Sequence, residues 1–242
     1  MVPPERPDPE GLHRLPLTAA LRLERGLLRE VWQRHGGRLL LVFVGLLLPM
    51  WGFAELADEI RESEPLAFDE PLLLWARSLA GPGMDRWLVA VTDAGYLYGV
   101  VPADVLLVVA LLLWRRLPEA TFAAIALAGS ALLNVGTKLL FARERPSLWE
   151  SIAPEVTYSF PSGHAMGSAT LAWVLVLLAW RTRWRWPVLL LVAPFVVLVG
   201  FSRVYLGVHY PSDILAGWAA ASVWAAASYF AVFRFRSVPW HR

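Results

Sequence analysis

The sequence predicts an all-α fold: a bundle of six transmembrane helices, with an additional interfacial helical segment between the first helix and the second. The composition is the first observation behind this prediction. Hydrophobic residues make up 57% of the 242 residues, the mean hydropathy is +0.50, and only 17% of residues are charged. A soluble domain of this length carries more charge and fewer long apolar runs. The second observation is a set of six apolar stretches, each near the ~20 residues that a helix needs to cross ~30 Å of hydrocarbon.

The amino-terminal region precedes the apolar part of the chain. Residues 1–17 are rich in proline and charge, and no basic stretch leads into a short apolar core, so we expect a disordered tail and no signal peptide. Residues 18–36 intersperse leucine with arginine. This pattern is compatible with an amphipathic helix on the membrane surface or with a helical extension of the first span. We predict a cytoplasmic tail and amphipathic helix over 1–36, a six-span domain over 37–234, and a short cytoplasmic tail over 235–242.

The six spans are expected to be helical because backbone groups in lipid must be hydrogen-bonded within the segment. Their expected ranges are 38–56, 97–114, 119–140, 164–181, 186–203 and 210–233. The segment 57–96 contains several prolines and glycines, and its apolar pieces are too short to span a membrane. We therefore expect interfacial or re-entrant helices there, packed beside the bundle.

Basic residues predict the orientation of the spans. If the amino terminus is cytoplasmic, the segments on that side hold thirteen arginines near the spans, and the opposite side holds seven arginines or lysines. Cytoplasmic segments of membrane proteins carry the excess of basic residues. The sequence therefore predicts a multi-pass protein of the cell (inner or plasma) membrane with both termini in the cytoplasm.

Three polar clusters fall on the outer side of this topology. They are Lys138 followed after six residues by Arg145-Pro146, then Pro161-Ser162-Gly163-His164, then Ser202-Arg203 followed by His209 and Asp213. Each cluster lies at the end of an expected span. Segments scattered over 76 residues of sequence should therefore converge on one membrane face.

The first chemical feature of these clusters is their positive charge. Lys138, Arg145 and Arg203 gathered in one place favour a multiply charged anion, because arginine forks match phosphate oxygens and lysine adds a mobile point charge. Ser162 can cap the following helix and leave the N–H groups of Gly163 and His164 available, and a helix amino terminus is a ready phosphate site. The clusters together predict a phosphate-binding site.

The second feature is a pair of histidines, which can supply a nucleophile and a general acid. Asp213 follows His209 by four residues, so its carboxylate can hold one imidazole nitrogen and leave the other as the nucleophile. Each residue alone also has a plain structural interpretation. Lys138 can extend to the interface from a helix end, and Asp213 can serve only as a helix cap. The complete set argues for phosphate chemistry.

With K-x6-RP, PSGH and SR-x5-H-x3-D present in this order, the sequence resembles the type 2 phosphatidic acid phosphatase superfamily, including its bacterial membrane lipid phosphatases, over about residues 40–233. The resemblance implies phosphate binding by Lys138, Arg145, Ser162, Gly163 and Arg203. It also implies that His209 attacks phosphorus, Asp213 orients His209, and His164 protonates the leaving oxygen. No cofactor is implied, and the three clusters contain no set of carboxylates that would hold a metal ion.

The expected function is therefore metal-independent hydrolysis of a lipid phosphate or diphosphate through a phosphohistidine, on the outer face of the membrane. Candidate substrates are polyprenyl diphosphate, which we place first, phosphatidic acid and phosphatidylglycerophosphate. Two alternatives stay open: a non-catalytic membrane protein that binds phospholipid, and a phosphatase or phosphotransferase acting on another phosphorylated substrate. A net charge of +2 is too small to indicate nucleic acid as a partner. The sequence makes no prediction about the oligomeric state.

Overall fold

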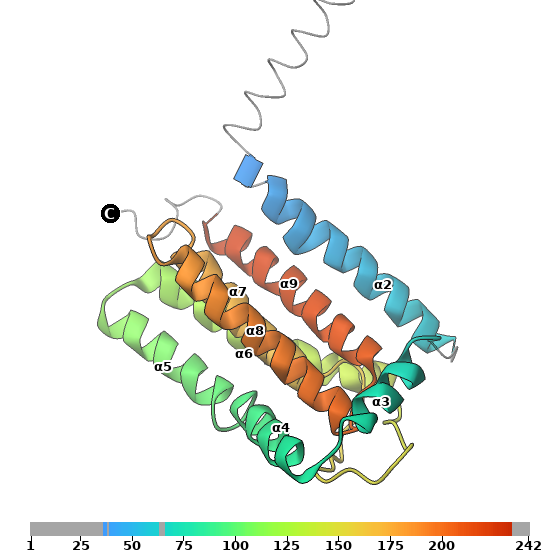
Figure 1. Ribbon diagram of the computed structural model, residues 1–242. Coiled ribbons are helices and arrows are strands. Elements are labelled where there is room, and N and C mark those ends of the chain that lie inside the picture. Colours follow the sequence, from blue (N-terminus) through green and yellow to red (C-terminus); the bar gives the residue numbers. More distant parts are fainter. Residues whose placement is uncertain (1–35, 38, 63–65, 234–242) are drawn as a thin grey trace, which may run out of the picture. The chain divides into compact units, whose positions relative to one another are not determined.

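The computed structural model describes residues 36–37, 39–62 and 66–233, and all regular structure in this part of the chain is helical. Internal contacts divide the chain after Val42, and the second unit begins at Phe43. Its elements are η2 (Phe43–Leu47), α2 (Leu48–Arg61), α3 (Asp69–Ser78), α4 (Pro82–Ala94), α5 (Val100–Leu113), α6 (Leu117–Phe141), α7 (Gly163–Ala179), α8 (Arg185–Tyr205) and α9 (Pro211–Phe233) (Figure 1). Of the tail and surface helix predicted over 1–36, residues 1–35 lie outside the described residues, and so does the tail predicted over 235–242.

Among the described residues, four helical stretches are long and apolar enough to cross a membrane, namely Leu39–Arg61, Leu117–Phe141, Arg185–Tyr205 and Pro211–Phe233. The two other predicted spans correspond to shorter apolar helices, α5 with 14 residues and α7 with 17. At 1.5 Å per residue, α5 reaches only about 21 Å. The all-α membrane fold is thus confirmed, whereas the number of six spans stays a prediction.

The segment between the first two predicted spans forms the helices α3 and α4. Two of its prolines lie in the first turns of these helices and do not interrupt them: Pro71 lies in the first turn of α3, and Pro82 is the first residue of α4. Proline is tolerated there because the first-turn N–H groups have no partner within the helix. Both helices pack against α8, and α3 also contacts α9. The helical nature of this segment agrees with the prediction, and its interfacial location stays a prediction.

Helix α7 has neighbours on several sides, because it contacts α5, α6, α8 and α9 (Figure 1). Small residues allow the closest of these approaches. A Cβ added to Gly217 of α9 would lie 2.9 Å from the carbonyl oxygen of Ser162 and 3.1 Å from the Cβ of Ala165. Glycine at 217 therefore lets the start of α9 lie directly against the start of α7, and these are the segments that carry two of the predicted polar clusters.

Much of the outer surface is apolar. Leu140 on α6 is 77% exposed, and Leu190 and Leu191 on α8 are 73% and 74% exposed. Soluble monomers rarely expose large contiguous apolar patches. Such leucines on helices of spanning length fit contact with lipid tails.

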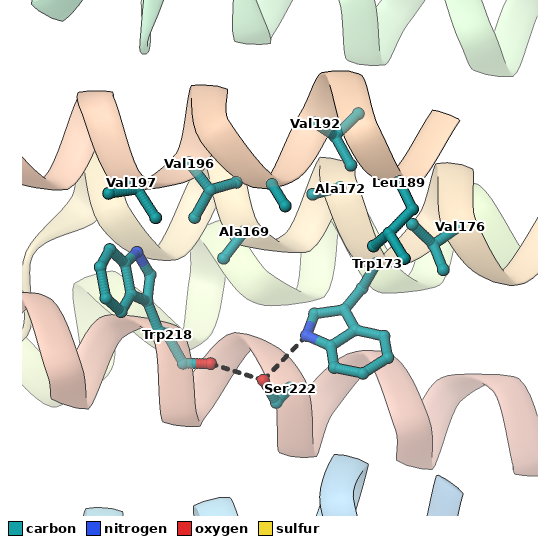
Figure 2. A pocket seen from close by; sticks show the side chains of 11 residues that line it. Ala169, Ala172, Trp173, Val176, Leu189, Val192, Val196, Val197, Trp218 and Ser222 are labelled. Atoms are coloured by element: carbon teal, nitrogen blue, oxygen red, sulfur yellow. Dashed lines mark hydrogen bonds between the residues drawn. The ribbon is translucent and has the colours of Figure 1, made fainter. Parts of the chain in front are cut away.

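A cavity of about 270 Å³ lies between α7, α8 and α9 (Figure 2). Its lining is almost entirely apolar. Trp173 Nε1 donates to Ser222 Oγ at 2.8 Å, and this hydroxyl donates to the carbonyl oxygen of Trp218, also at 2.8 Å. None of the predicted site residues lines this cavity, so this cavity and the predicted chemistry are in different places.

Candidate active site

The predicted site residues lie at one end of the helices α6 to α9. Lys138 is in the last turn of α6 and Arg203 in the last turn of α8, whereas His164 begins α7 and Asp213 lies in the first turn of α9. Successive helices run in opposite directions, so the carboxyl ends of α6 and α8 meet the amino ends of α7 and α9. His209 lies in the turn that joins α8 to α9.

The carboxylate of Glu155 lies at the centre of the predicted phosphate-binding residues. Arg145 Nη2 is 2.8 Å from Glu155 Oε2, and Arg203 Nη2 forms an ion pair with Glu155 Oε1. His164 Nδ1 lies 3.6 Å from the same Oε1. Two arginines and one histidine, from three separate clusters of the sequence, therefore surround one anionic group. Glu155 belongs to none of the three clusters, so no motif indicated it.

His209 is fully buried, and its neighbours determine which ring nitrogen carries the proton. Nε2 lies 3.1 Å from Arg145 Nη1, while Nδ1 lies 3.4 Å from Asp213 Oδ2 and 3.3 Å from Ser159 Oγ. A guanidinium only donates, so Nε2 accepts, and the proton of the neutral ring belongs on Nδ1. The lone pair of Nε2 therefore faces the guanidinium of Arg145, which is where a bound anion would lie.

The charge state of His209 follows from the same surroundings. Burial lowers the pKa of His209 to about 4, although the hydrogen bond and the charge of Asp213 act in the opposite direction. A neutral imidazole is the nucleophilic form. This pKa keeps the imidazole of His209 neutral at neutral pH.

Asp213 is fully buried and has more partners than the sequence predicted. Its Oδ2 accepts from Ser159 Oγ at 2.5 Å and from the backbone N–H of Tyr210 at 2.8 Å. Its Oδ1 pairs with Arg143 Nη1 at 2.6 Å. Several donors share this carboxylate, so His209 is only one of the partners of Asp213.

Arg143 connects this carboxylate to helix α3. Arg143 Nη2 pairs with Asp69 Oδ2 at 2.9 Å, and Asp69 Oδ1 accepts from the backbone N–H of Ser212 at 2.9 Å. Asp69 is 74 residues away from Arg143 along the chain. Helix α3, which belongs to the segment predicted to be interfacial, is thereby connected to the first turn of α9. No motif indicated these contacts.

Lys138 contacts the loop that carries Glu155. Its Nζ donates to Thr157 Oγ1 at 3.2 Å and to the carbonyl oxygen of Tyr158. Arg145 Nη2 donates to the same Thr157 hydroxyl at 3.0 Å. Two of the three cations predicted to bind phosphate therefore also share a hydroxyl of the 155–158 segment.

Ser162 and Gly163 form the start of α7 as predicted. Ser162 Oγ accepts from the N–H of Ala165 at 3.4 Å, which is the expected cap. A Cβ on Gly163 would lie 3.0 Å from Asn134 Oδ1, so glycine allows α6 to pass close to this helix end. Asn134 Nδ2 in turn donates to the carbonyl oxygen of Pro161 at 3.1 Å. The ring of His164, one residue further, packs on Tyr96.

The fold and the site together define a helical membrane protein with a cluster of cations beside a neutral buried histidine, an arrangement suited to phosphate chemistry. Residues 119–237 match the model of the PAP2 superfamily. The chain is 29% identical over 171 residues to phosphatidylglycerophosphatase B of Bacillus subtilis (strain 168), covering 69% of this chain and 84% of that protein. It is 34% identical over 162 residues to the putative undecaprenyl-diphosphatase YbjG of Escherichia coli (strain K12), covering 63% of this chain and 77% of that protein.

A solved structure supports the fold. It is the crystal structure of a transmembrane PAP2 type phosphatidylglycerolphosphate phosphatase from Bacillus subtilis, with a TM-score of 0.68 and 24% identity, covering 78% of this chain and 96% of that one. This protein belongs to the PAP2 superfamily. Its membership confirms the family and the enzyme class predicted from the sequence, a membrane hydrolase of phosphate esters. The roles of the individual side chains stay predictions.

Proposed function

We propose that this protein is an integral-membrane lipid phosphatase that hydrolyses a phosphate monoester or diphosphate of a lipid through a phosphohistidine, without a metal ion. One observation carries the proposal. Arg145, Arg203 and His164 converge on a single anionic group, and Nε2 of His209 points at Arg145 beside it. Two arginine forks around one anion match the oxygens of a phosphoryl group.

In the first step, Nε2 of His209 attacks phosphorus and the bond from phosphorus to the leaving oxygen breaks. The leaving oxygen takes a proton from His164. The His209 ring becomes positively charged, and Asp213 stabilises it through the N–H at Nδ1. Negative charge develops on the equatorial oxygens of the phosphoryl group, where Arg145 and Arg203 stabilise it.

In the second step, His164 is neutral and acts as the base. It takes a proton from a water molecule while the water oxygen attacks phosphorus, and the bond between phosphorus and His209 Nε2 breaks. Inorganic phosphate leaves, and both histidines return to their starting states. Lys138, Ser162 and Gly163 are assigned to phosphate binding in both steps. The N–H of Ser162 donates to the carbonyl oxygen of Asp213 at 3.1 Å, so Ser162 would contribute its hydroxyl and Gly163 its N–H.

Several features support a lipid as the substrate. The site lies at the ends of helices whose flanks expose leucines, so a head group can reach it while the tails stay in the bilayer. The relatives named above act on phosphatidylglycerophosphate and, in the putative assignment, undecaprenyl diphosphate. We place polyprenyl diphosphate first, followed by phosphatidylglycerophosphate and phosphatidic acid.

We also infer the topology and domain limits from the sequence: six spans within 37–234, both termini in the cytoplasm, and the site on the outer face. The alternating direction of α6 to α9 supports this inference, because it brings all the site residues to one end. Helices α5 and α7 are then spans completed by the residues that flank them.

The experiment is phosphate release by purified protein from each of the three lipids and from a water-soluble phosphate monoester, in the presence of EDTA. We expect release from at least one lipid, inhibition by vanadate, and no turnover by His209→Ala. Loss of activity in EDTA that Mg²⁺ restores would overturn the metal-independent mechanism. Binding of these lipids without any phosphate release would identify a non-catalytic lipid-binding protein.

A further inference from the structure

Glu155 has no place in the mechanism above, yet its carboxylate occupies the centre of the site. Both of its oxygens are used: Oε2 by Arg145 at 2.8 Å, and Oε1 by Arg203 and, at 3.6 Å, by His164. These are the side chains to which the proposed mechanism assigns the phosphoryl oxygens and the leaving oxygen. A carboxylate and a phosphoryl group present similar pairs of oxygens to an arginine fork. Both groups cannot occupy this position at once.

The charges make Glu155 a suitable substitute for phosphate. Arg203 is 2% exposed, and a buried guanidinium without an anionic partner is costly. Burial acts to raise the pKa of Glu155, but the positive charges of Arg203 and Arg145 act in the opposite direction, and the pKa is lowered. Glu155 is therefore ionised at neutral pH and compensates the positive charge of the site.

The surroundings of Glu155 allow it to leave. The side chain of Glu155 is 26% exposed, and its neighbour Val156 is fully exposed. Ile152 on the same loop is 55% exposed. The loop around Glu155 thus buries little apolar surface, whereas Thr157 and Tyr158 are held by Lys138 and Arg145.

We propose that Glu155 is an internal competitor of the substrate phosphate: its carboxylate takes the phosphoryl position, and a substrate binds only by displacing it. This inference rests on the proposed function for its account of substrate choice. A terminal phosphate carries about −1.5 to −2 charges at pH 7, whereas the phosphodiester of an ordinary phospholipid carries one. Because binding displaces the single negative charge of a carboxylate, the terminal phosphate with its larger charge is favoured over the phosphodiester. Glu155 thereby selects terminal phosphates in a membrane where phosphodiesters are abundant.

The test uses inorganic phosphate as the probe and needs no turnover. Its affinity is measured from the thermal stabilisation of the purified full-length protein over a range of phosphate concentrations. We expect Glu155→Gln to bind phosphate about 10-fold more tightly than the wild type, a difference of roughly 1.4 kcal/mol. Glu150→Gln, an exposed glutamate of the same loop, should bind phosphate like the wild type.

A second variant separates position from charge. Glu155→Asp keeps the charge but is one methylene shorter, so its carboxylate cannot reach both arginines as Glu155 does, and phosphate binding should again tighten. Phosphate binding by Glu155→Gln that is equal to the wild type or weaker would overturn the proposal and make Glu155 an anchor of the arginines. Wild-type affinity in Glu155→Asp would show that charge alone acts and would also overturn it.

Substrate choice is tested by inhibition of turnover with phosphatidylglycerol, a lipid phosphodiester. We expect stronger inhibition of Glu155→Gln than of the wild type, and equal inhibition would overturn the selective role. If the wild type hydrolyses no lipid phosphate, the proposed function fails. The phosphate affinities would still decide whether Glu155 competes for the anion site.

Discussion

Lys138 is the residue for which structural and chemical roles separate most clearly. It is the only lysine of the chain, and its Nζ donates to Thr157 and Tyr158 at the edge of the site. A lysine that merely extends to the membrane interface can be replaced by arginine at little cost, because both side chains keep their charge in water. A lysine that contacts a transferring phosphoryl group cannot, because a guanidinium is wider and planar.

We therefore expect kcat/KM to fall in the order wild type, Lys138→Arg, Lys138→Met. Loss of a cation that contacts the phosphoryl group should reduce the rate roughly 10²–10³-fold in Lys138→Met. The melting temperature should change little, since the aliphatic part of the side chain is kept. Steady-state kinetics of the purified variants check this expectation. Wild-type kinetics in both variants would make Lys138 an interfacial anchor.

Arg143 is expected to act on catalysis through Asp213. Its two terminal nitrogens bridge Asp213 and Asp69 at 2.6 and 2.9 Å. Arg143→Met leaves both carboxylates without this partner, and loss of one partner of a buried ion pair costs about 3–5 kcal/mol. We expect a lower melting temperature and a lower kcat with a smaller change in KM, and partial rescue in Arg143→Lys. Arg86→Lys, at an exposed position of α4, is the control. A change in KM alone would contradict a positioning role.

His209 links the site to the pH dependence of stability. Its pKa in the folded protein is about 4, below the ~6.5 of an unfolded chain. The unfolded chain therefore binds a proton first as the pH falls, and the stability contributed by neutral His209 is complete above pH ~6.5 and is lost down to pH ~4. Between pH 7 and pH 5 this loss is roughly 2 kcal/mol. Thermal unfolding at both pH values should show a smaller decrease for His209→Gln than for the wild type. Equal decreases would show that burial does not keep His209 neutral.

At the scale of helices, the lengths of the apolar stretches predicted where several of the helices begin and end. The expected ranges 119–140, 186–203 and 210–233 agree with α6, α8 and α9 to within two residues at every end. Helix α5 is shorter than expected, because residues 95–99 form turns and the helix begins only at Val100. The polar clusters lie close together as predicted, because each lies at a helix end and successive helices run in opposite directions.

The contacts that complete the site were not predictable in this way. Arg143, Asp69 and Glu155 belong to no periodic pattern, and their partners lie 48 to 74 residues away in the pairs Arg203–Glu155, Arg143–Asp213 and Arg143–Asp69. Such contacts depend on how loops fold over the helix ends. Hydropathy and spacing do not encode them.

A substitution at Gly217 tests whether the close packing of α9 on α7 is needed for activity. A Cβ at this position meets the backbone oxygen of Ser162 at 2.9 Å, so Gly217→Ala should push the start of α9 away from α7. We expect a lower melting temperature and at least a 10-fold loss of kcat, because Asp213 and His164 lie within one turn of the contact. Gly136→Ala is the matched control, since a Cβ there meets nothing within 4 Å and alanine favours a helix over glycine. Unchanged activity in Gly217→Ala would show that the helix ends tolerate separation.

At the scale of the whole molecule, the arginines of the segments that connect the helices lie at the opposite ends of α6, α7 and α8 from the site. Arg115 and Arg116 precede α6, and Arg181, Arg183 and Arg185 lie between α7 and the start of α8. The site residues lie at the other ends of the same helices. Because cytoplasmic segments carry the excess of basic residues, we predict from this arrangement that the site lies on the outer face.

Cysteine labelling tests this orientation, and it is unusually clean here because the chain has no cysteine of its own. Ser151 lies in the loop before α7, on the side of the site, and Thr182 lies in the arginine-rich connection between α7 and α8. In intact cells, we expect a membrane-impermeant maleimide to label Ser151→Cys and to label Thr182→Cys only after the membrane is opened. Both variants should keep phosphatase activity, which controls for misfolding. Labelling of Thr182→Cys from outside in intact cells would reverse the topology and place the site in the cytoplasm.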